Sequence, residues 1–110
     1  MTNWVKVATT SDFTDGEPVY FDFEFETVAI FRLGDAFYAI EDRCSHDDGP
    51  LGEGQLDRAA CEIVCPRHGA RFDLRSGAAL SMPAVYPVRR YEVRVEGEAV
   101  YLAEPDEGDG

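Results

Sequence analysis

Both histidines of this 110-residue chain stand shortly after a cysteine. The first pair is Cys44-Ser45-His46, the second is Cys65-Pro66-Arg67-His68, and residues 47–64 separate them. Thiolate sulfur and neutral imidazole nitrogen both bind metals, and these short spacings let the two side chains of a pair point the same way. Pro66 restricts φ and Gly69 follows the second histidine, which is typical of a rigid turn. The two pairs predict a metal site with four ligands of two chemical kinds.

Two kinds of metal centre fit this ligand set. Two thiolates on one iron and two imidazoles on another hold a [2Fe–2S] cluster, which carries one electron at a time. Two cysteines and two histidines can also hold a single tetrahedral Zn²⁺ in a structural module. A cluster is coloured and becomes paramagnetic on one-electron reduction, whereas zinc is colourless and redox-silent. Spectroscopy therefore separates the two.

Residues around the two pairs extend the pattern. Gly49-Pro50-Leu51 follows the first pair, Gly69-x-x-Phe72-Asp73 completes the second, and Gly77 and Pro83 come later. In this order the motifs resemble the Rieske family, and the similarity runs through nearly the whole chain. The resemblance implies an antiparallel base of two sheets with a third, small sheet carrying the cluster loops at one tip.

The resemblance also implies roles for the four ligands. Cys44 and Cys65 would bind the inner iron of one Rieske [2Fe–2S] cluster, and His46 and His68 would bind the outer iron near solvent. Pro83-Ala84 resembles the third, proline-containing loop of the family, which lies over the cluster.

The function implied by this resemblance is that of a ferredoxin, a one-electron carrier and not an enzyme. Such a carrier accepts electrons from a flavoprotein reductase and passes them to a terminal oxygenase. The sequence counts against an oxygenase, because a catalytic iron needs two further histidines and a carboxylate, and both histidines are already committed. A small subunit of a larger reductase, of the nitrite-reductase type, is the alternative.

Departures from the family pattern indicate a low-potential branch. Respiratory Rieske proteins carry one additional cysteine on each ligand loop, joined as a disulfide; the equivalents here are Asp48 or Gly49 and Arg67. Ala70 stands at a position where members of the high-potential branch have serine. One hydroxyl that could donate a hydrogen bond to a cluster sulfur is therefore missing. Fewer such bonds lower the potential, and we expect a value of about −150 mV.

Other residues near the motifs have two interpretations each. Cys61 could be a fifth ligand, but its apolar neighbours favour an ordinary buried cysteine on a strand. Arg67 and Arg71 flank the second loop and could raise the potential or meet a partner, or simply be solvated. Asp47 and Asp48 would add negative potential near the outer iron, or cap a turn.

Charge and composition narrow the function classes. The chain has 10 Lys and Arg against 22 Asp and Glu, a net charge of −12, which counts against nucleic acid and anionic membrane surfaces. Residues 1–13 lack the basic start and apolar core of a signal peptide, and runs such as 28–31 are far too short to span a bilayer. Cys61 has no partner for a disulfide framework, so we expect a cytoplasmic protein, and we expect a monomer.

The ligands must be positioned by the secondary structure around them. Apolar residues recur mostly at every second position, which predicts an all-β domain with little helix. We expect a single Rieske-like domain over residues 1–104 and a mobile acidic tail over 105–110. Within the domain we expect an antiparallel sandwich or barrel base, an inserted cluster lobe over about 42–73 and a proline loop near 83. Phe21 and Phe23 should share one face. Strands are expected at residues 4–8, 19–23, 27–33, 37–40, 61–64, 71–74, 91–95 and 99–102, with hairpin turns at 24–26, 33–36 and 96–98. Five aromatic residues are expected in the core rather than as electron relays: Trp4, Phe21, Phe23, Phe31 and Phe37.

Overall fold

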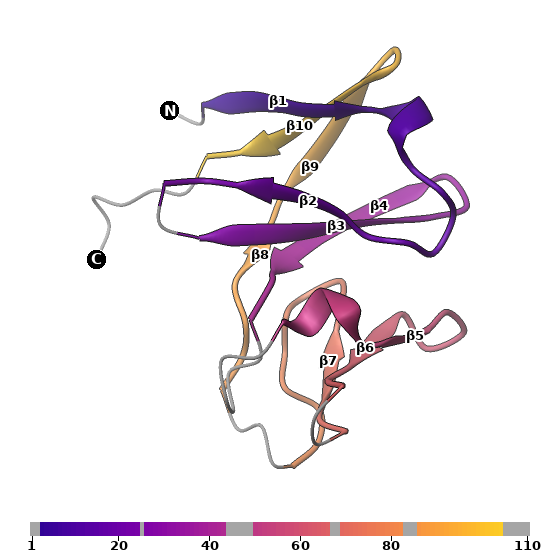
Figure 1. Ribbon diagram of the computed structural model, residues 1–110, viewed down its shortest axis with the longest axis vertical. Helices are drawn as coiled ribbons and strands as arrows, with labels where there is room; N and C mark the ends of the chain where they lie inside the picture. The colour runs from indigo at the N-terminus through magenta and orange to yellow at the C-terminus, as the bar shows by residue number, and fades with distance from the viewer. Residues whose placement is uncertain (1–2, 25, 44–49, 67–68, 83–85, 105–110) are drawn as a thin grey trace.

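The computed structural model describes residues 3–24, 26–43, 50–66, 69–82 and 86–104. Over these residues the chain forms three antiparallel sheets with two short 3₁₀ helices (Figure 1). This confirms the predicted all-β class and the third, small sheet. In the described part of the chain, no helix is long and apolar enough to cross a membrane.

Two of the sheets form the base. The first has the order β1-β10-β9, with β1 at Trp4–Thr9, β10 at Ala99–Ala103 and β9 at Val93–Glu96. The second has the order β2-β3-β4-β8, with β2 at Val19–Asp22, β3 at Thr27–Leu33, β4 at Ala36–Glu41 and β8 at Arg90–Tyr91. The helix η1, at Thr10–Asp12, follows β1.

The third sheet lies at one end of the molecule, below the base in Figure 1. Its order is β5-β6-β7, with β5 at Gln55–Asp57, β6 at Glu62–Val64 and β7 at Arg71–Asp73. The helix η2, at Leu51–Glu53, precedes it. The sequence did not predict β5, which is only three residues long.

The predicted hairpins are confirmed by their pairing. Leu33 pairs with Ala36 around Gly34, whose φ of 63° is the left-handed conformation that glycine adopts without strain. Glu96 pairs with Ala99 around Gly97 in the same way. The β2–β3 hairpin also forms, although its turn contains no glycine. Phe23 N donates to Glu26 O at 2.8 Å, and Glu26 N donates to Phe23 O at 3.4 Å.

The second sheet, β2-β3-β4-β8, is the middle sheet of the three and packs on both faces. This explains why four consecutive residues of β3 are buried. Ala29 and Phe31 pack into a core cluster shared with the third sheet. Val28 and Ile30 point the other way, into a cluster shared with the first sheet. The predicted core positions of Phe21, Phe23, Phe31 and Phe37 are confirmed, since each belongs to or packs against one of these clusters. Trp4 lies half-buried in β1, with the guanidinium of Arg94 5.6 Å from its ring.

The strand predicted over 91–95 is wrong in one respect, because it is two strands in two sheets. β8 pairs with β4 in the middle sheet, and β9 pairs with β10 in the first. The chain crosses between the sheets at Glu92, whose carbonyl accepts a hydrogen bond from Ala103 N. Apolar alternation continues through the crossing, so the local pattern does not reveal it.

Candidate metal centre

Of the four predicted ligands, the structure describes Cys65. Cys44, His46 and His68 lie outside the described residues, as do Arg67, Asp47 and Asp48. Cys65 directly follows β6, is 2% exposed and belongs to the core cluster shared with the middle sheet. Its sulfur is thus held in apolar surroundings at the end of a strand.

Backbone hydrogen bonds close the loop that follows Cys65. Cys65 N donates to Ala70 O at 2.7 Å, and Gly69 N donates to Cys65 O at 3.1 Å. Gly69 has a φ of 74°, so the turn requires the conformational freedom of glycine there. Val64 pairs with Arg71 at the base of the loop. These bonds agree with the turn predicted for this segment, as far as its residues are described; its rigidity stays a prediction.

The residues on either side of the first ligand loop are held close together. Gly52 N donates to Asp42 Oδ1 at 2.6 Å, which ties the end of β4 to η2. The pKa of the Asp42 carboxyl is raised overall. Burial raises it most, the Gly52 hydrogen bond lowers it in part, and nearby Glu53 raises it further. Leu51 is fully buried in the same core cluster as Cys65. Leu51, which follows the first ligand loop, and Cys65, which begins the second, therefore share one apolar core.

The segment after β7 returns along the open edge of that strand. Phe72 forms a bridge with Ala79, and Val88 N donates to Gly77 O at 2.8 Å. A Cβ on Gly77 would lie 2.2 Å from Val88 O, and the φ of Gly77 is 79°, so a side chain is excluded there. The backbone contact explains why the motif has glycine at this position.

Arg71 is engaged inside the third sheet. Its Nη1 lies 3.1 Å from Glu62 Oε1 and 3.2 Å from Asp57 Oδ2, which joins all three strands of the sheet. Hydrogen bonds to Glu62 and then to Asp57 raise the pKa of Arg71. The Arg71 side chain remains 44% exposed, as a solvated surface arginine would be, and the two ion pairs are added to that prediction.

Cys61 is at the opposite end of β6 from Cys65. The prediction that Cys61 belongs to the strand is wrong: β6 begins at Glu62, and Cys61 precedes it with a φ of 57°, a left-handed turn conformation. It is partly buried against the core cluster that contains Cys65. Burial raises the pKa of Tyr38, and the adjacent Cys61 thiol contributes further.

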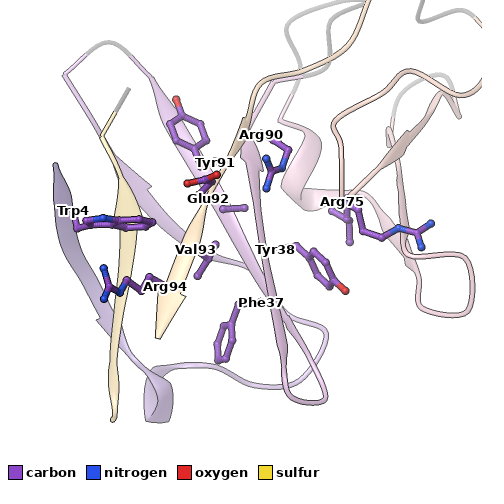
Figure 2. Close-up of a pocket in the computed structure, with 11 residues that line it drawn as sticks. Trp4, Phe37, Tyr38, Arg75, Arg90, Tyr91, Glu92, Val93 and Arg94 are labelled. Carbon is purple, nitrogen blue, oxygen red and sulfur yellow. The ribbon is translucent and has the colours of Figure 1, made fainter. Parts of the chain in front are cut away.

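A hollow of about 550 Å³, which the sequence did not predict, lies where the sheets meet (Figure 2). Its lining includes Arg75, Arg90 and Arg94, but Arg75 pairs with Asp73 and Arg94 pairs with Glu96. Glu92 also lines it, so these side chains and their partners carry no net charge. Cys65 is not among its lining residues.

The donor chemistry of the described site fits a thiolate-bound iron. Cys65 offers a buried sulfur at the end of a strand, within a turn closed by backbone hydrogen bonds, and such a prebuilt position suits a centre that changes charge without rearranging.

Comparison with known proteins agrees. The Rieske [2Fe–2S] domain family matches residues 3–92. The 3-phenylpropionate/cinnamic acid dioxygenase ferredoxin subunit of Escherichia coli strain K12 is 38% identical over 104 residues, covering 94% of this chain and 96% of the relative.

Solved structures give the same picture. The ferredoxin of carbazole 1,9a-dioxygenase from Nocardioides aromaticivorans IC177 is 40% identical, covers 94% of this chain and 99% of its own, and has a TM-score of 0.89. A chain in a complex of reduced oxygenase and oxidised ferredoxin in carbazole 1,9a-dioxygenase is 38% identical, with coverages of 91% and 92% and a TM-score of 0.83.

The predicted alternatives are less well supported. A Mycobacterium tuberculosis protein described as an NADH-dependent nitrite reductase small subunit is 22% identical, with coverages of 96% and 98% and a TM-score of 0.83, and this likeness shows the fold alone. A structural zinc module does not account for the family match. The chain belongs to the Rieske [2Fe–2S] domain family and, like the ferredoxins it resembles along nearly its whole length, is a one-electron carrier with a Rieske cluster.

Proposed function

We propose that this ferredoxin takes single electrons from a flavoprotein reductase and delivers them to the terminal oxygenase of a multicomponent dioxygenase. One observation carries the proposal: the similarity to two dioxygenase ferredoxins covers 94% of this chain and at least 96% of each of those relatives. The structure of a similar ferredoxin in complex with its oxygenase supports the acceptor. A reductase is proposed because a carrier that gives up electrons must be re-reduced by a donor.

The proposed ligands are those of the motif. Cys44 and Cys65 hold the inner iron, and His46 and His68 hold the outer iron. The burial of Cys65 and the shared core beneath both loops support this division, because the thiolate end would face the protein and the imidazole end solvent. The bound cluster supplies reversible one-electron chemistry. Electrons would then leave through the imidazole side.

The docking face is proposed to surround the two histidines, with Asp47 and Asp48 contributing negative charge toward a basic partner. We further propose a cytoplasmic monomer with one domain over residues 1–104, a cluster lobe over 42–73 and an acidic tail over 105–110. These proposals suit a small carrier that meets two partners in turn through one exposed tip.

Reduced-state EPR on purified holoprotein tests the ligands. The wild type should give a Rieske signal after one-electron reduction, and His46→Ala and His68→Ala should each lose it together with the visible colour. Cys65→Ser should lose it as well. Cys61→Ser is the matched control, since it changes a cysteine at the other end of β6, and it should keep both. A colourless wild type holding zinc, or an unchanged signal in either histidine variant, would contradict the assignment.

Reconstitution tests the role. Holoprotein should couple reductant oxidation by a flavoprotein reductase to product formation by a dioxygenase oxygenase of the similar systems. The rate should rise with ferredoxin concentration and then saturate. If reductase and oxygenase turn over equally fast without the ferredoxin, the proposed role is wrong.

A further inference from the structure

Two glutamates meet where β4 leaves the middle sheet toward the first ligand loop. Glu41 is the last residue of β4, and Glu26 directly precedes β3, which pairs with β4. Their side chains hydrogen-bond to each other. The Glu26 side chain is 18% exposed and the Glu41 side chain is 15% exposed. Two mostly buried carboxyl groups therefore lie in direct contact, at a place to which electron transfer assigns no role.

Glu41 also completes the pairing of β4 with β8. Ile40 pairs with Arg90 in this ladder, which places Glu41 opposite Arg89. Glu41 N donates to Arg89 O at 2.8 Å, whereas the return bond runs from Arg89 N to Glu41 Oε1 at 2.9 Å. In a regular antiparallel pair the acceptor of that bond would be a backbone carbonyl. The Glu41 carboxyl group thus takes a backbone role at the end of the ladder.

Two arginines face the pair of carboxyl groups. Arg89 Nη1 lies 3.5 Å from Glu26 Oε2, and Arg43 Nε lies 3.4 Å from Glu41 Oε2. Both arginine side chains are more than half exposed, so solvent weakens their attraction for the carboxylates. The pKa of Glu26 is raised: burial contributes most, and the charge of Glu41 and its hydrogen bond add to this, while Arg89 and Arg43 offset it only in part.

Two ionised carboxylates in contact repel each other, whereas one proton between them turns the contact into a hydrogen bond. We propose that Glu26 and Glu41 form a proton-binding site: in the folded protein the two carboxyl groups share one proton, which passes to solvent as the pH rises and leaves the junction of β3, β4 and β8 less stable. Neither glutamate belongs to the ligand motif. The inference therefore goes beyond the proposed function and does not depend on it.

Loss of this proton weakens the fold because the pKa of Glu26 is raised above its unfolded value. In the unfolded chain the pKa of a glutamate is about 4.3. The contribution of the pair to stability is complete below that value and is lost as the pH rises through the higher folded value. Glutamine at position 26 keeps a hydrogen-bond donor but cannot ionise, so it imitates the protonated side chain at every pH.

Carbon-13 NMR of the glutamate carboxyl groups in oxidised holoprotein tests for the shared proton. In the wild type, Glu26 should titrate at higher pH than Glu24, an exposed glutamate in the same hairpin turn. Glu41→Gln removes the second carboxyl group but keeps the oxygen that accepts from Arg89 N, and it should move the Glu26 midpoint to lower pH. Glu24→Gln is the matched control, which removes an equal charge from the turn and should leave that midpoint unchanged. Equal wild-type midpoints for Glu24 and Glu26, or a Glu26 midpoint that Glu41→Gln does not move, would overturn the proposal.

Urea unfolding of holoprotein tests the consequence for stability. Glu26→Gln should have the same midpoint as the wild type at about pH 4 and a higher midpoint at about pH 8, because only the wild type has lost a proton there. Glu24→Gln should differ from the wild type much less at both values. If Glu26→Gln gains no more than Glu24→Gln at the higher pH, the ionised pair does not weaken the fold and the proposal fails.

The wild-type titration requires no variant to fold, so it decides the proposal even if Glu41→Gln is unstable. Its result is also separate from that of the proposed function. A wild type that lacks the Rieske EPR signal contradicts the ligands and leaves the titration of Glu26 unaffected. An intact EPR signal with an ordinary titration of Glu26 contradicts only this inference.

Discussion

Cys65 and Ala70 face each other across the second ligand turn, joined by a 2.7 Å backbone hydrogen bond. Ala70 is fully buried and carries only a methyl group, so it offers no hydroxyl to a cluster sulfur. Hydrogen bonds to the sulfurs stabilise the reduced cluster. We therefore expect the residue at position 70 to influence the potential.

Ala70→Ser should raise the midpoint potential by about 40 mV, which corresponds to about 1 kcal/mol of preferential hydrogen bonding to the reduced form. The wild-type value should lie near the bottom of the Rieske span, at about −150 mV. Spectroelectrochemical titration of both proteins measures the shift. A wild-type potential well above zero would contradict the assignment to the low-potential branch, and an unchanged value in the variant would show that the new hydroxyl does not reach a sulfur.

Glycine at position 77 is required by backbone contact as well as by φ. Gly77→Ala should lower the free energy of unfolding at least about twice as much as Gly97→Ala does. Gly97 is the control, because it has a similar left-handed φ and nothing lies within 4 Å of an added Cβ. The control should lose about 1–2 kcal/mol from strain alone. Urea unfolding of both holoproteins gives the comparison, and equal losses would mean that the Val88 carbonyl moves aside freely.

Between elements, Asp15 joins the base to the third sheet. Its carboxylate accepts a hydrogen bond from Gly34 N in the β3–β4 turn at 2.9 Å, and it pairs with Arg58, in the turn after β5, at 2.6 Å. The Gly34 hydrogen bond and then Arg58 lower the pKa of Asp15. Because the pKa is lower in the folded state, the contribution to stability is present above the ordinary value of about 3.9 and is lost as pH falls through the lowered value.

Asp15→Asn should therefore be slightly less stable than wild type between about pH 5 and pH 7, and the difference should shrink below about pH 4. The loss is small because the pair is exposed. Urea unfolding midpoints across this range test the prediction. Asp35→Asn is the control, because it removes an equal charge next to Gly34 in the β3–β4 turn. A difference that grows on acidification would have the wrong sign for this mechanism.

For the whole molecule, the net charge of −12 is the property that can act on charged partners at a distance. If this charge steers docking, transfer between reductase and ferredoxin should slow about tenfold as salt rises, since surface fields are screened within about 8 Å at physiological ionic strength. Stopped-flow reduction at several salt concentrations measures it. Oxidation of the reduced cluster by dioxygen, a neutral oxidant, should not vary. A flat profile for the reductase would leave the acidity with a role in solubility alone.

The all-β class and the glycine hairpins could be predicted from the sequence, because each depends on neighbours in the chain; the ligand pairs stay a prediction of the same local kind. Cys and His spacing, the φ > 0 preference of Gly34 and Gly97, and the period-two alternation are local properties. The resemblance added the three-sheet arrangement. These features required no knowledge of which distant segments pair.

Only the tertiary structure decided which sheet each strand joins. The crossing at Glu92, the burial of β3 on both faces, the left-handed Cys61 and the bond from Arg71 to Ser81 all depend on partners elsewhere in the chain. An apolar alternation looks the same whether a strand continues or changes sheet, and a serine looks the same whether it is solvated or ends a ladder. Long-range pairing settles these points, because it determines which backbone groups are left to be satisfied by side chains.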